Sequence, residues 1–326
     1  MDPRQRATLG RTSLTVTRFG LGTAPLGGLF TEVADEEAHG VVEAAWAAGV
    51  RLFDTAPLYG HGLAERRLGA VLGDRPRDAF TLATKVGRLL RAGAPLEPGQ
   101  NFRGLPPVNP VFDFSYDGAL RSVTESLERL GLDRVDVVHI HDPDDHFDEA
   151  LRGAYPALDR LRREGAIGAV GAGMNQAEML ARFAREADFD CFLLAGRYTL
   201  LDQVALRELL PLCRDRGIAV MAGGVLNSGI LADPRPGATY DYTRATHEVL
   251  SRARRLDEIC RSHGVPLKAA AIQFPLGHPA ITSVLLGCRS RAELAENMRM
   301  SETVIPTALW GELKAEGMLA EEVPTP

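Results

Sequence analysis

The chain has 326 residues, of which 45% are hydrophobic and 25% charged, a composition typical of a globular protein with a large apolar core. Lys and Arg number 37 against 43 Asp and Glu, and the net charge of −6 excludes a general electrostatic attraction to nucleic acid or to anionic membranes. We expect neither as a partner, although a local basic pocket for a phosphate group is compatible with this balance.

Apolar segments and amphipathic segments alternate along almost the whole chain. Residues 7–17, ATLGRTSLTVT, place a Gly-Arg turn between apolar flanks and predict an N-terminal β-hairpin that caps part of the fold. Short apolar segments then predict strands at residues 18–23, 51–55, 81–87, 135–142, 166–173, 190–198, 218–224 and 283–287. Each is followed by a segment with helical periodicity, at residues 35–49, 64–73, 116–131, 149–165, 176–187, 204–217, 244–264 and 290–298.

This alternation predicts one α/β fold. Nearly continuous apolar strands separated by helices are typical of a parallel sheet that is covered on both faces. Eight such units favour a closed (β/α)8 (TIM) barrel, with long loops at its C-terminal face, over an open sheet. A doubly wound dinucleotide-binding sheet is the alternative, but no Gly-x-Gly-x-x-Gly opens a helix after the first strand. No linker divides the chain, so residues 1–326 are predicted to form a single domain.

Three irregular segments are candidates for the walls of a binding site. Residues 88–116 and 225–243 are long for loops inside a compact barrel, and such loops are usually lids or binding walls rather than mobile surface excursions. Residues 303–326 are predicted to form an irregular tail that supplies a third wall. The first loop carries four aromatic residues that favour a ligand wall: Phe102, Phe112, Phe114 and Tyr116.

Ionisable residues stand where three consecutive predicted strands end. Asp54 ends the second strand, Lys85 the third and His141 the fourth. Tyr59 lies in the loop that directly follows the second strand. Because catalytic groups in a (β/α)8 barrel sit at the C-terminal ends of strands, we expect these four side chains to converge on one rim.

Together these groups are suited to moving a proton on and off a carbon–oxygen group. A free Tyr has a pKa of about 10, and the nearby Lys85 ammonium is expected to lower it, so Tyr59 is the predicted general acid/base. Asp54 would neutralise and orient Lys85, and His141 would hydrogen-bond the substrate oxygen. No side chain donates hydride, so the reaction requires a nicotinamide. Taken singly, such residues are more often a structural ion pair, a packed Tyr and a core His.

These residues also resemble the aldo-keto reductases, a family with an Asp–Tyr–Lys–His tetrad on a (β/α)8 barrel. FDTAPLYGHGLAERRLG (residues 53–69) is similar to the first signature of the family, while LATKVG carries Lys85 and VHIHDP carries His141. The resemblance extends from about residue 9 to about residue 300. It implies an enzyme that interconverts carbonyls and alcohols of small molecules with NAD(P)(H) and without a metal.

The resemblance also implies coenzyme contacts. GAGMNQ is similar to the segment whose Asn binds the nicotinamide carboxamide, VLNSGIL to the loop over the pyrophosphate, and GCRSRAELAEN to the adenosine-binding end. The residues implied are Thr23, Asp54, Met174, Asn175, Leu226, Ser228, Arg289, Glu296 and Asn297.

The chain departs from the family pattern at three positions. Ala195 stands where many members have a Gln, and Arg197 is a candidate to compensate for it. Gly223 stands where many have an aromatic residue on the nicotinamide. Glu293 stands near the site of the adenosine 2′-phosphate, where a carboxylate favours NAD over NADP, whereas Arg289 favours the phosphate. The balance gives a slight preference for NAD.

Three segments resemble one branch of the family more closely. AGRYTLLDQ, VFDFSYDGALRS and HIHDPDDH are similar to bacterial L-fucose and D-threo-aldose 1-dehydrogenases, and pyridoxal 4-dehydrogenases are similar as well. The implied reaction is oxidation of an aldose at C1, as a cyclic hemiacetal, to a lactone. Pyridoxal oxidation and general aldehyde reduction are the alternatives.

Two further alternatives belong to other functional classes. His139 and His141 face the same side of a strand, as metal ligands do in barrel hydrolases, and Asp142 and Asp54 would complete a set; such sites need more ligands from other strands. His139 otherwise packs or hydrogen-bonds inside the barrel. A non-catalytic coenzyme-binding subunit, like the potassium-channel β subunits of the family, is the other alternative, and the intact tetrad argues against it.

The sequence also bears on localisation. MDPRQRATLG lacks the apolar core of a signal peptide, and no apolar run approaches the ~20 residues of a membrane span. The cysteines form no Cys-x-x-Cys pair, so we expect free thiols and a cytoplasmic protein: Cys191, Cys213, Cys260 and Cys288. No pattern in the sequence indicates an oligomeric state.

Overall fold

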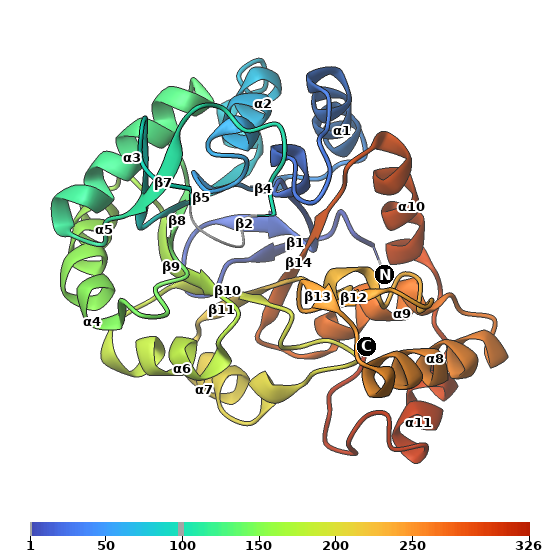
Figure 1. Ribbon diagram of the computed structural model, residues 1–326. Helices are drawn as coiled ribbons and strands as arrows, with labels where there is room; N and C mark the ends of the chain where they lie inside the picture. The colour runs from blue at the N-terminus through green and yellow to red at the C-terminus, as the bar shows by residue number, and fades with distance from the viewer. Residues whose placement is uncertain (1, 97–100) are drawn as a thin grey trace.

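The computed structural model describes residues 2–96 and 101–326. Within them, eight parallel strands form a barrel: β3 (Phe19–Gly22), β4 (Leu52–Asp54), β5 (Thr81–Val86), β8 (Val137–His141), β9 (Ala169–Met174), β10 (Cys191–Ala195), β11 (Ala219–Gly223) and β14 (Ile281–Gly287). They close in the order β10–β11–β14–β3–β4–β5–β8–β9, which is the order of the chain, and helices cover the outside (Figure 1). The predicted (β/α)8 fold class is therefore confirmed.

The helices lie mostly where the sequence predicts them. They are α1 (Asp35–Ala47), α2 (Leu63–Leu72), α3 (Tyr116–Leu130), α4 (Phe147–Glu149), α5 (Tyr155–Arg163), α6 (Ala177–Glu186), α7 (Leu209–Arg216), α8 (His247–Ser262), α9 (Leu267–Gln273), α10 (Arg291–Glu302) and α11 (Thr307–Ala315). Capping sets several of these ends: Ser115 accepts the Gly118 N–H at the start of α3, and Gly131 ends that helix at φ 62°. No helix in the described part of the chain is long and apolar enough to span a membrane.

The tail prediction is wrong in one respect, because residues 303–326 include α11. Leu309, Trp310 and Leu313 of this helix are buried, with Leu309 and Leu313 one turn apart on the same face. This apolar face packs on the hydrophobic core beside α8, as Figure 1 shows at the red end of the chain. The tail is therefore anchored to the outside of the barrel by helix packing.

Both long loops contain small hairpins. In residues 88–116, β6 (Arg88–Arg91) pairs antiparallel with β7 (Asn109–Phe112). In the second loop, β12 (Thr239–Tyr240) pairs antiparallel with β13 (Thr243–Arg244). Asp241 and Tyr242 turn this second hairpin with positive φ, as a two-residue hairpin turn requires.

The N-terminal hairpin closes the end of the barrel opposite the strand C-termini. Its strands, β1 (Arg6–Thr8) and β2 (Thr15–Thr17), pair antiparallel. Leu9 and Val16 are fully buried and pack on apolar residues inside the barrel, including Leu52 and Ala169. The predicted cap is thus a plug that fills the lower part of the barrel.

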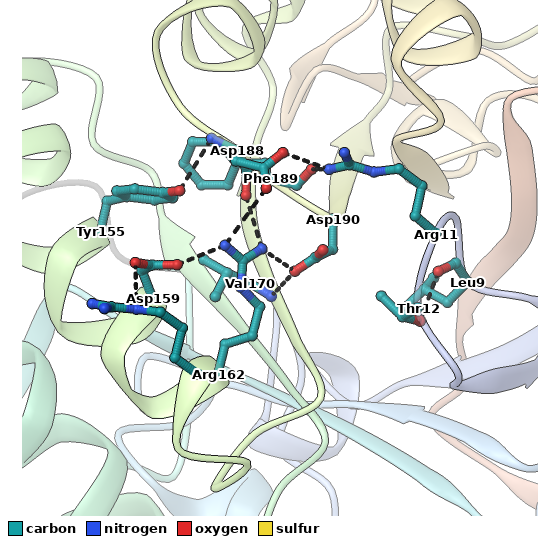
Figure 2. A network of polar contacts seen from close by, with 11 residues as sticks. Leu9, Arg11, Thr12, Tyr155, Asp159, Arg162, Val170, Asp188, Phe189 and Asp190 are labelled. Atoms are coloured by element: carbon teal, nitrogen blue, oxygen red, sulfur yellow. Dashed lines mark hydrogen bonds and ion pairs between the residues drawn. The ribbon is translucent and has the colours of Figure 1, made fainter.

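A polar network ties this plug to the barrel wall (Figure 2). Arg11, in the turn of the hairpin, donates to Asp188 Oδ1 at 2.7 Å and to the Phe189 carbonyl at 3.1 Å. Arg162 of α5 donates to Asp190 Oδ2 at 2.7 Å and to Asp159 Oδ1 at 2.6 Å. The same Asp190 oxygen accepts the Val170 N–H of β9 at 2.8 Å. The network therefore joins α5, β9 and the segment before β10.

We expect Arg162→Met to lower the free energy of unfolding by about 2 kcal/mol. The Asp190 side chain is only 10% exposed, and the change removes the charged partner of its carboxylate. Arg163→Met is the matched control, since Arg163 is 71% exposed and its pair with Asp159 should contribute well under about 1 kcal/mol. Urea unfolding of both variants tests this expectation. Equal midpoints for the two would show that the network contributes no more than a surface pair.

Candidate active site

Asp54 and Lys85 form a buried ion pair at the C-terminal end of the barrel. Lys85 Nζ donates to Asp54 Oδ1 at 2.8 Å, to Asp54 Oδ2 at 2.7 Å and to the Thr55 carbonyl at 2.9 Å. Both side chains are at most 3% exposed. Burial raises the pKa of Asp54, and Lys85 opposes that rise. The ammonium is thus held by three acceptors and fixed in direction.

Tyr59 and His141 lie against this pair. Lys85 Nζ lies 4.7 Å from the centre of the Tyr59 ring. The Tyr59 and His141 rings meet edge to face with centroids 5.7 Å apart. Burial, followed by Arg88 and Lys85, lowers the pKa of His141 well below its usual value, so its imidazole is neutral and carries one N–H. The four side chains predicted to converge are in fact neighbours.

The predicted direction of the Tyr59 pKa shift is wrong for this arrangement. Burial raises the Tyr59 pKa well above its ordinary value, and the carboxylates of Asp54 and Asp142 raise it further. The physical reason is that Lys85 is already paired with both oxygens of Asp54, so little of its charge is left to stabilise a phenolate. Tyr59 is accordingly a neutral phenol that holds its proton at neutral pH.

Two adjoining cavities open at these residues. The first has a volume of about 450 Å³ and is lined by Tyr59, Lys85 and His141. The second, of about 240 Å³, is lined by Asp54 and by a series of glycines: Gly22, Gly196, Gly223, Gly224 and Gly287. Tyr59, Asn175 and Tyr242 line both cavities, so a ligand in one lies directly beside a ligand in the other.

The second cavity fits an extended coenzyme. Its glycine-lined wall lets a ligand approach the backbone closely, and a Cβ at Gly223 would lie 3.3 Å from Leu193 Cδ2. Asn227 Oδ1, on the same wall, is buried and has no hydrogen-bond partner in the described residues. Buried polar atoms are normally satisfied, so this oxygen indicates a polar ligand.

The residues implied for the nicotinamide end lie at this cavity or beside it. Asn175 follows β9, and its side chain is hydrogen-bonded to Tyr242. Met174 is buried and lines the first cavity. Thr23 is fully buried, and both its N–H and its hydroxyl donate to the Asp54 carbonyl, so its position supports Asp54.

The two residues implied for the pyrophosphate loop, Leu226 and Ser228, lie in different surroundings. Ser228 lines the second cavity and adopts φ 58°, and its hydroxyl oxygen accepts the Tyr242 N–H at 2.9 Å. The side chain of Leu226 packs on the hydrophobic core, and the resemblance implies a contact through the backbone around this residue. Asn227, which was not among the predicted residues, also lines the cavity.

The residues implied for the adenosine end lie beyond Gly287, around the start of α10. The Arg289 guanidinium donates to Glu293 Oε1 at 2.8 Å, so these two candidates neutralise each other. Glu296 accepts from Lys268 at 2.6 Å. Asn297 is buried and donates to Cys288 Sγ, while its Oδ1 has no partner in the described residues.

The wall predictions for the aromatic residues hold only in part. Phe102 lines the first cavity, and Leu29 and Phe102 bridge two loops there. Phe114 is buried in the core, and Tyr116 packs against that core. Phe112 is exposed and lies under the Arg88 guanidinium at 4.5 Å. Phe112 and Phe114 stack on each other with ring centroids 5.8 Å apart, away from the cavity lining.

Sequence reasoning missed Arg88 and considered Asp142 only as a ligand of the metal-hydrolase alternative. Arg88 and Asp142 line the first cavity and lie 3.5 Å apart, measured from Arg88 Nη2 to Asp142 Oδ2. Each directly follows the end of a barrel strand or the glycine after it, which is the signal that would have placed both at this site. Arg197 does not replace the missing Gln, because it forms a two-fold ion pair with Asp241 and holds the β12–β13 hairpin.

His139 is fully buried inside the barrel. Its strand partner is Lys85, and in the described residues neither of its ring nitrogens has a hydrogen-bond partner. Burial and the Lys85 charge lower its pKa to about 3. The described residues contain no group of three or more His, Cys, Asp or Glu arranged to hold a metal ion, so the hydrolase alternative lacks a ligand set.

Comparison with known proteins identifies the family. The model described as the Aldo/keto reductase family matches residues 18–316. The chain belongs to the aldo/keto reductase family. A pyridoxal 4-dehydrogenase from Microbacterium luteolum is 43% identical over 97% of this chain and 98% of its own, and a D-threo-aldose 1-dehydrogenase from a Pseudomonas species is 44% identical over 96% of each. An aldo-keto reductase from Bacillus halodurans in its holo form superposes with a TM-score of 0.75 at 25% identity, covering 98% of this chain and 97% of that one.

Membership of the aldo/keto reductases makes the protein an oxidoreductase that acts on small molecules and uses NAD(P)(H). The enzyme class predicted from the sequence and its resemblance to this family are confirmed. The two dehydrogenase relatives differ in the substrates their names give, and so the family alone leaves the substrate to be argued from the site.

Proposed function

We propose that this aldo-keto reductase is an aldose 1-dehydrogenase that oxidises C1 of a cyclic sugar to a lactone. The observation that carries the proposal is the first cavity, in which Tyr59, Lys85 and His141 lie beside hydrogen-bonding side chains such as Asn101 and Gln176. A polyhydroxylated substrate needs such partners, because each hydroxyl that leaves water must be satisfied again.

In the proposed reaction, Tyr59 is the general base. As the phenolate, it takes the proton of the anomeric hydroxyl while the C1–oxygen double bond of the lactone forms, and as the neutral phenol it returns that proton in the reverse direction. A bound nicotinamide coenzyme supplies the acceptor for the hydride that leaves C1. His141 donates its N–H to the reacting oxygen, and Asp54 holds Lys85 against the Tyr59 ring.

We assign the second cavity to the coenzyme, with Asn175 and Ser228 among the residues that bind it. Arg289, Glu296 and Asn297 are assigned to its adenosine end. NAD is the proposed coenzyme in preference to NADP, because Glu293 neutralises Arg289 and adds a carboxylate where a 2′-phosphate would otherwise be attracted.

We expect Glu293→Gln to raise kcat/KM for NADP relative to NAD by about tenfold, since the change removes one charge and frees the Arg289 guanidinium. Steady-state kinetics with both coenzymes and one sugar measure this ratio. Glu302→Gln, farther along α10, is the matched control because Glu302 pairs with Arg4 instead. An unchanged ratio in Glu293→Gln would remove Glu293 from coenzyme selection.

A panel of L-fucose, D-arabinose, L-galactose and pyridoxal, assayed with NAD⁺ and NADP⁺, tests the proposed function. We expect the highest kcat/KM with an aldose. Pyridoxal oxidation is the second candidate, favoured by the 43% identity to a pyridoxal 4-dehydrogenase along nearly the whole chain. Turnover of pyridoxal alone would replace the first proposal with the second.

A further inference from the structure

The substrate-side cavity contains an ion pair that the proposed proton transfer does not use. Arg88 begins β6, and Asp142 directly follows β8. Arg88 Nη2 lies 3.5 Å from Asp142 Oδ2, and both residues line the cavity of about 450 Å³. Removing charged groups from water is costly. An Arg–Asp ion pair beside the reacting groups is therefore suited to binding a polar group of the substrate.

Asp142 is held in a conformation that non-glycine residues rarely adopt. Its φ is 43°, and its N–H donates to the Gly173 carbonyl at 3.0 Å. This backbone places Asp142 Oδ2 3.3 Å from His141 Nε2. The carboxylate is thereby fixed beside the imidazole that faces the reacting oxygen.

Arg88 is also fixed, and it has donor capacity to spare. Its Nη1 donates to the His141 carbonyl at 3.2 Å, and its guanidinium stacks on the Phe112 ring at 4.5 Å. Arg88 is 7% exposed, and its Nε has no hydrogen-bond partner in the described residues. A buried guanidinium with an unused donor is suited to an additional acceptor.

A carboxylate and a guanidinium side by side match one hydroxyl group well. The carboxylate accepts the hydroxyl proton, and the guanidinium donates to the hydroxyl oxygen. Oxygens on adjacent sugar carbons lie about one hydrogen-bond length apart, similar to the 3.3 Å between His141 Nε2 and Asp142 Oδ2. With His141 on the reacting oxygen, Asp142 is therefore within reach of the oxygen on the next carbon.

We propose that Asp142, supported by Arg88, binds the hydroxyl on the carbon next to the reacting carbon and so selects sugars that carry a C2 hydroxyl. This inference rests on the proposed aldose oxidation and names the substrate feature that the site recognises. Burial raises the pKa of Asp142 to about 6, against the influence of Arg88 and Lys85, so the carboxylate is ionised at pH 8.

D-Arabinose and 2-deoxy-D-ribose test the proposal, because they differ only in the hydroxyl at C2. At pH 8, the wild-type enzyme should favour D-arabinose in kcat/KM by about ten- to a hundredfold, the range for a hydrogen bond to a charged group. In Asp142→Asn the preference should fall to about threefold or less, mainly through a higher KM for D-arabinose. Asn tolerates positive φ, so this variant keeps the backbone conformation.

One control variant and one second test variant separate recognition of the hydroxyl from a structural effect. Asp145→Asn removes the same charge from an exposed position on the same loop and should keep the wild-type preference. Arg88→Met should reduce the preference as Asp142→Asn does. If Asp142→Asn lowers both kcat/KM values equally and the preference persists, the inference is wrong while the proposed function stands. Failure of the wild-type enzyme to oxidise any aldose would overturn both.

Discussion

Tyr59→Phe is expected to lower kcat for aldose oxidation by a factor of about 10² to 10⁴, the range for losing a general acid/base. The change removes only the phenolic oxygen, while the ring keeps its contacts with Phe102 and His141. Coenzyme affinity, measured by quenching of protein fluorescence, should change by less than about threefold, because the second cavity keeps its shape. Stopped-flow and steady-state rates measure the loss.

The pH dependence provides an independent check on the same residue. Oxidation requires the phenolate, whereas reduction requires the neutral phenol. Because burial and neighbouring carboxylates raise the Tyr59 pKa, the phenolate fraction should increase about tenfold per pH unit between pH 7 and pH 9. We expect kcat/KM for oxidation to rise over this range and kcat/KM for reduction to stay level. An oxidation rate of Tyr59→Phe near that of the wild type would assign the proton transfer to another group.

The fold and the core of the candidate site follow from simple sequence patterns. Strand ends of parallel sheets share one rim, so Asp54, Lys85 and His141 are neighbours whatever the details of packing. The position of Tyr59 beside them is also predictable, because the loop between Asp54 and Tyr59 is only a few residues long and has little conformational freedom. These positions depend on chain order and strand register, which hydrophobic periodicity sets.

Other features depend on contacts between segments far apart in the sequence. The Asp142 carboxylate is directed by a positive φ and by a hydrogen bond to Gly173, neither of which leaves a local pattern. The pairing of Lys85 with both oxygens of Asp54, which reverses the expected shift of the Tyr59 pKa, is likewise a matter of side-chain geometry. Arg197 was a reasonable candidate for the cavity, but the Asp241 carboxylate engages it from the second long loop.

Lys85→Met is expected to have the largest effect on stability. It leaves Asp54, which is 2% exposed, without its charged partner, and breaking a buried pair in this way costs about 3–5 kcal/mol. Turnover should fall as well, by at least about tenfold, because the position of Tyr59 against the ammonium is lost. Urea unfolding at constant pH measures the first effect and aldose oxidation the second.

The pH dependence of that loss distinguishes an unpaired charge from lost packing. Without Lys85, the pKa of Asp54 in the folded state rises further above its value in the unfolded chain, so the folded state binds the extra proton. The group then stabilises the fold at low pH, and this contribution is lost as pH rises toward the folded-state pKa. The variant should therefore be less destabilised at pH 5 than at pH 8.

Adding Asp54→Asn to Lys85→Met should restore about 2 kcal/mol of the free energy of unfolding at pH 8, because neither charge is then buried alone. A loss that is equal at both pH values and unrelieved in the double variant would mean that Lys85 stabilises the barrel by packing alone.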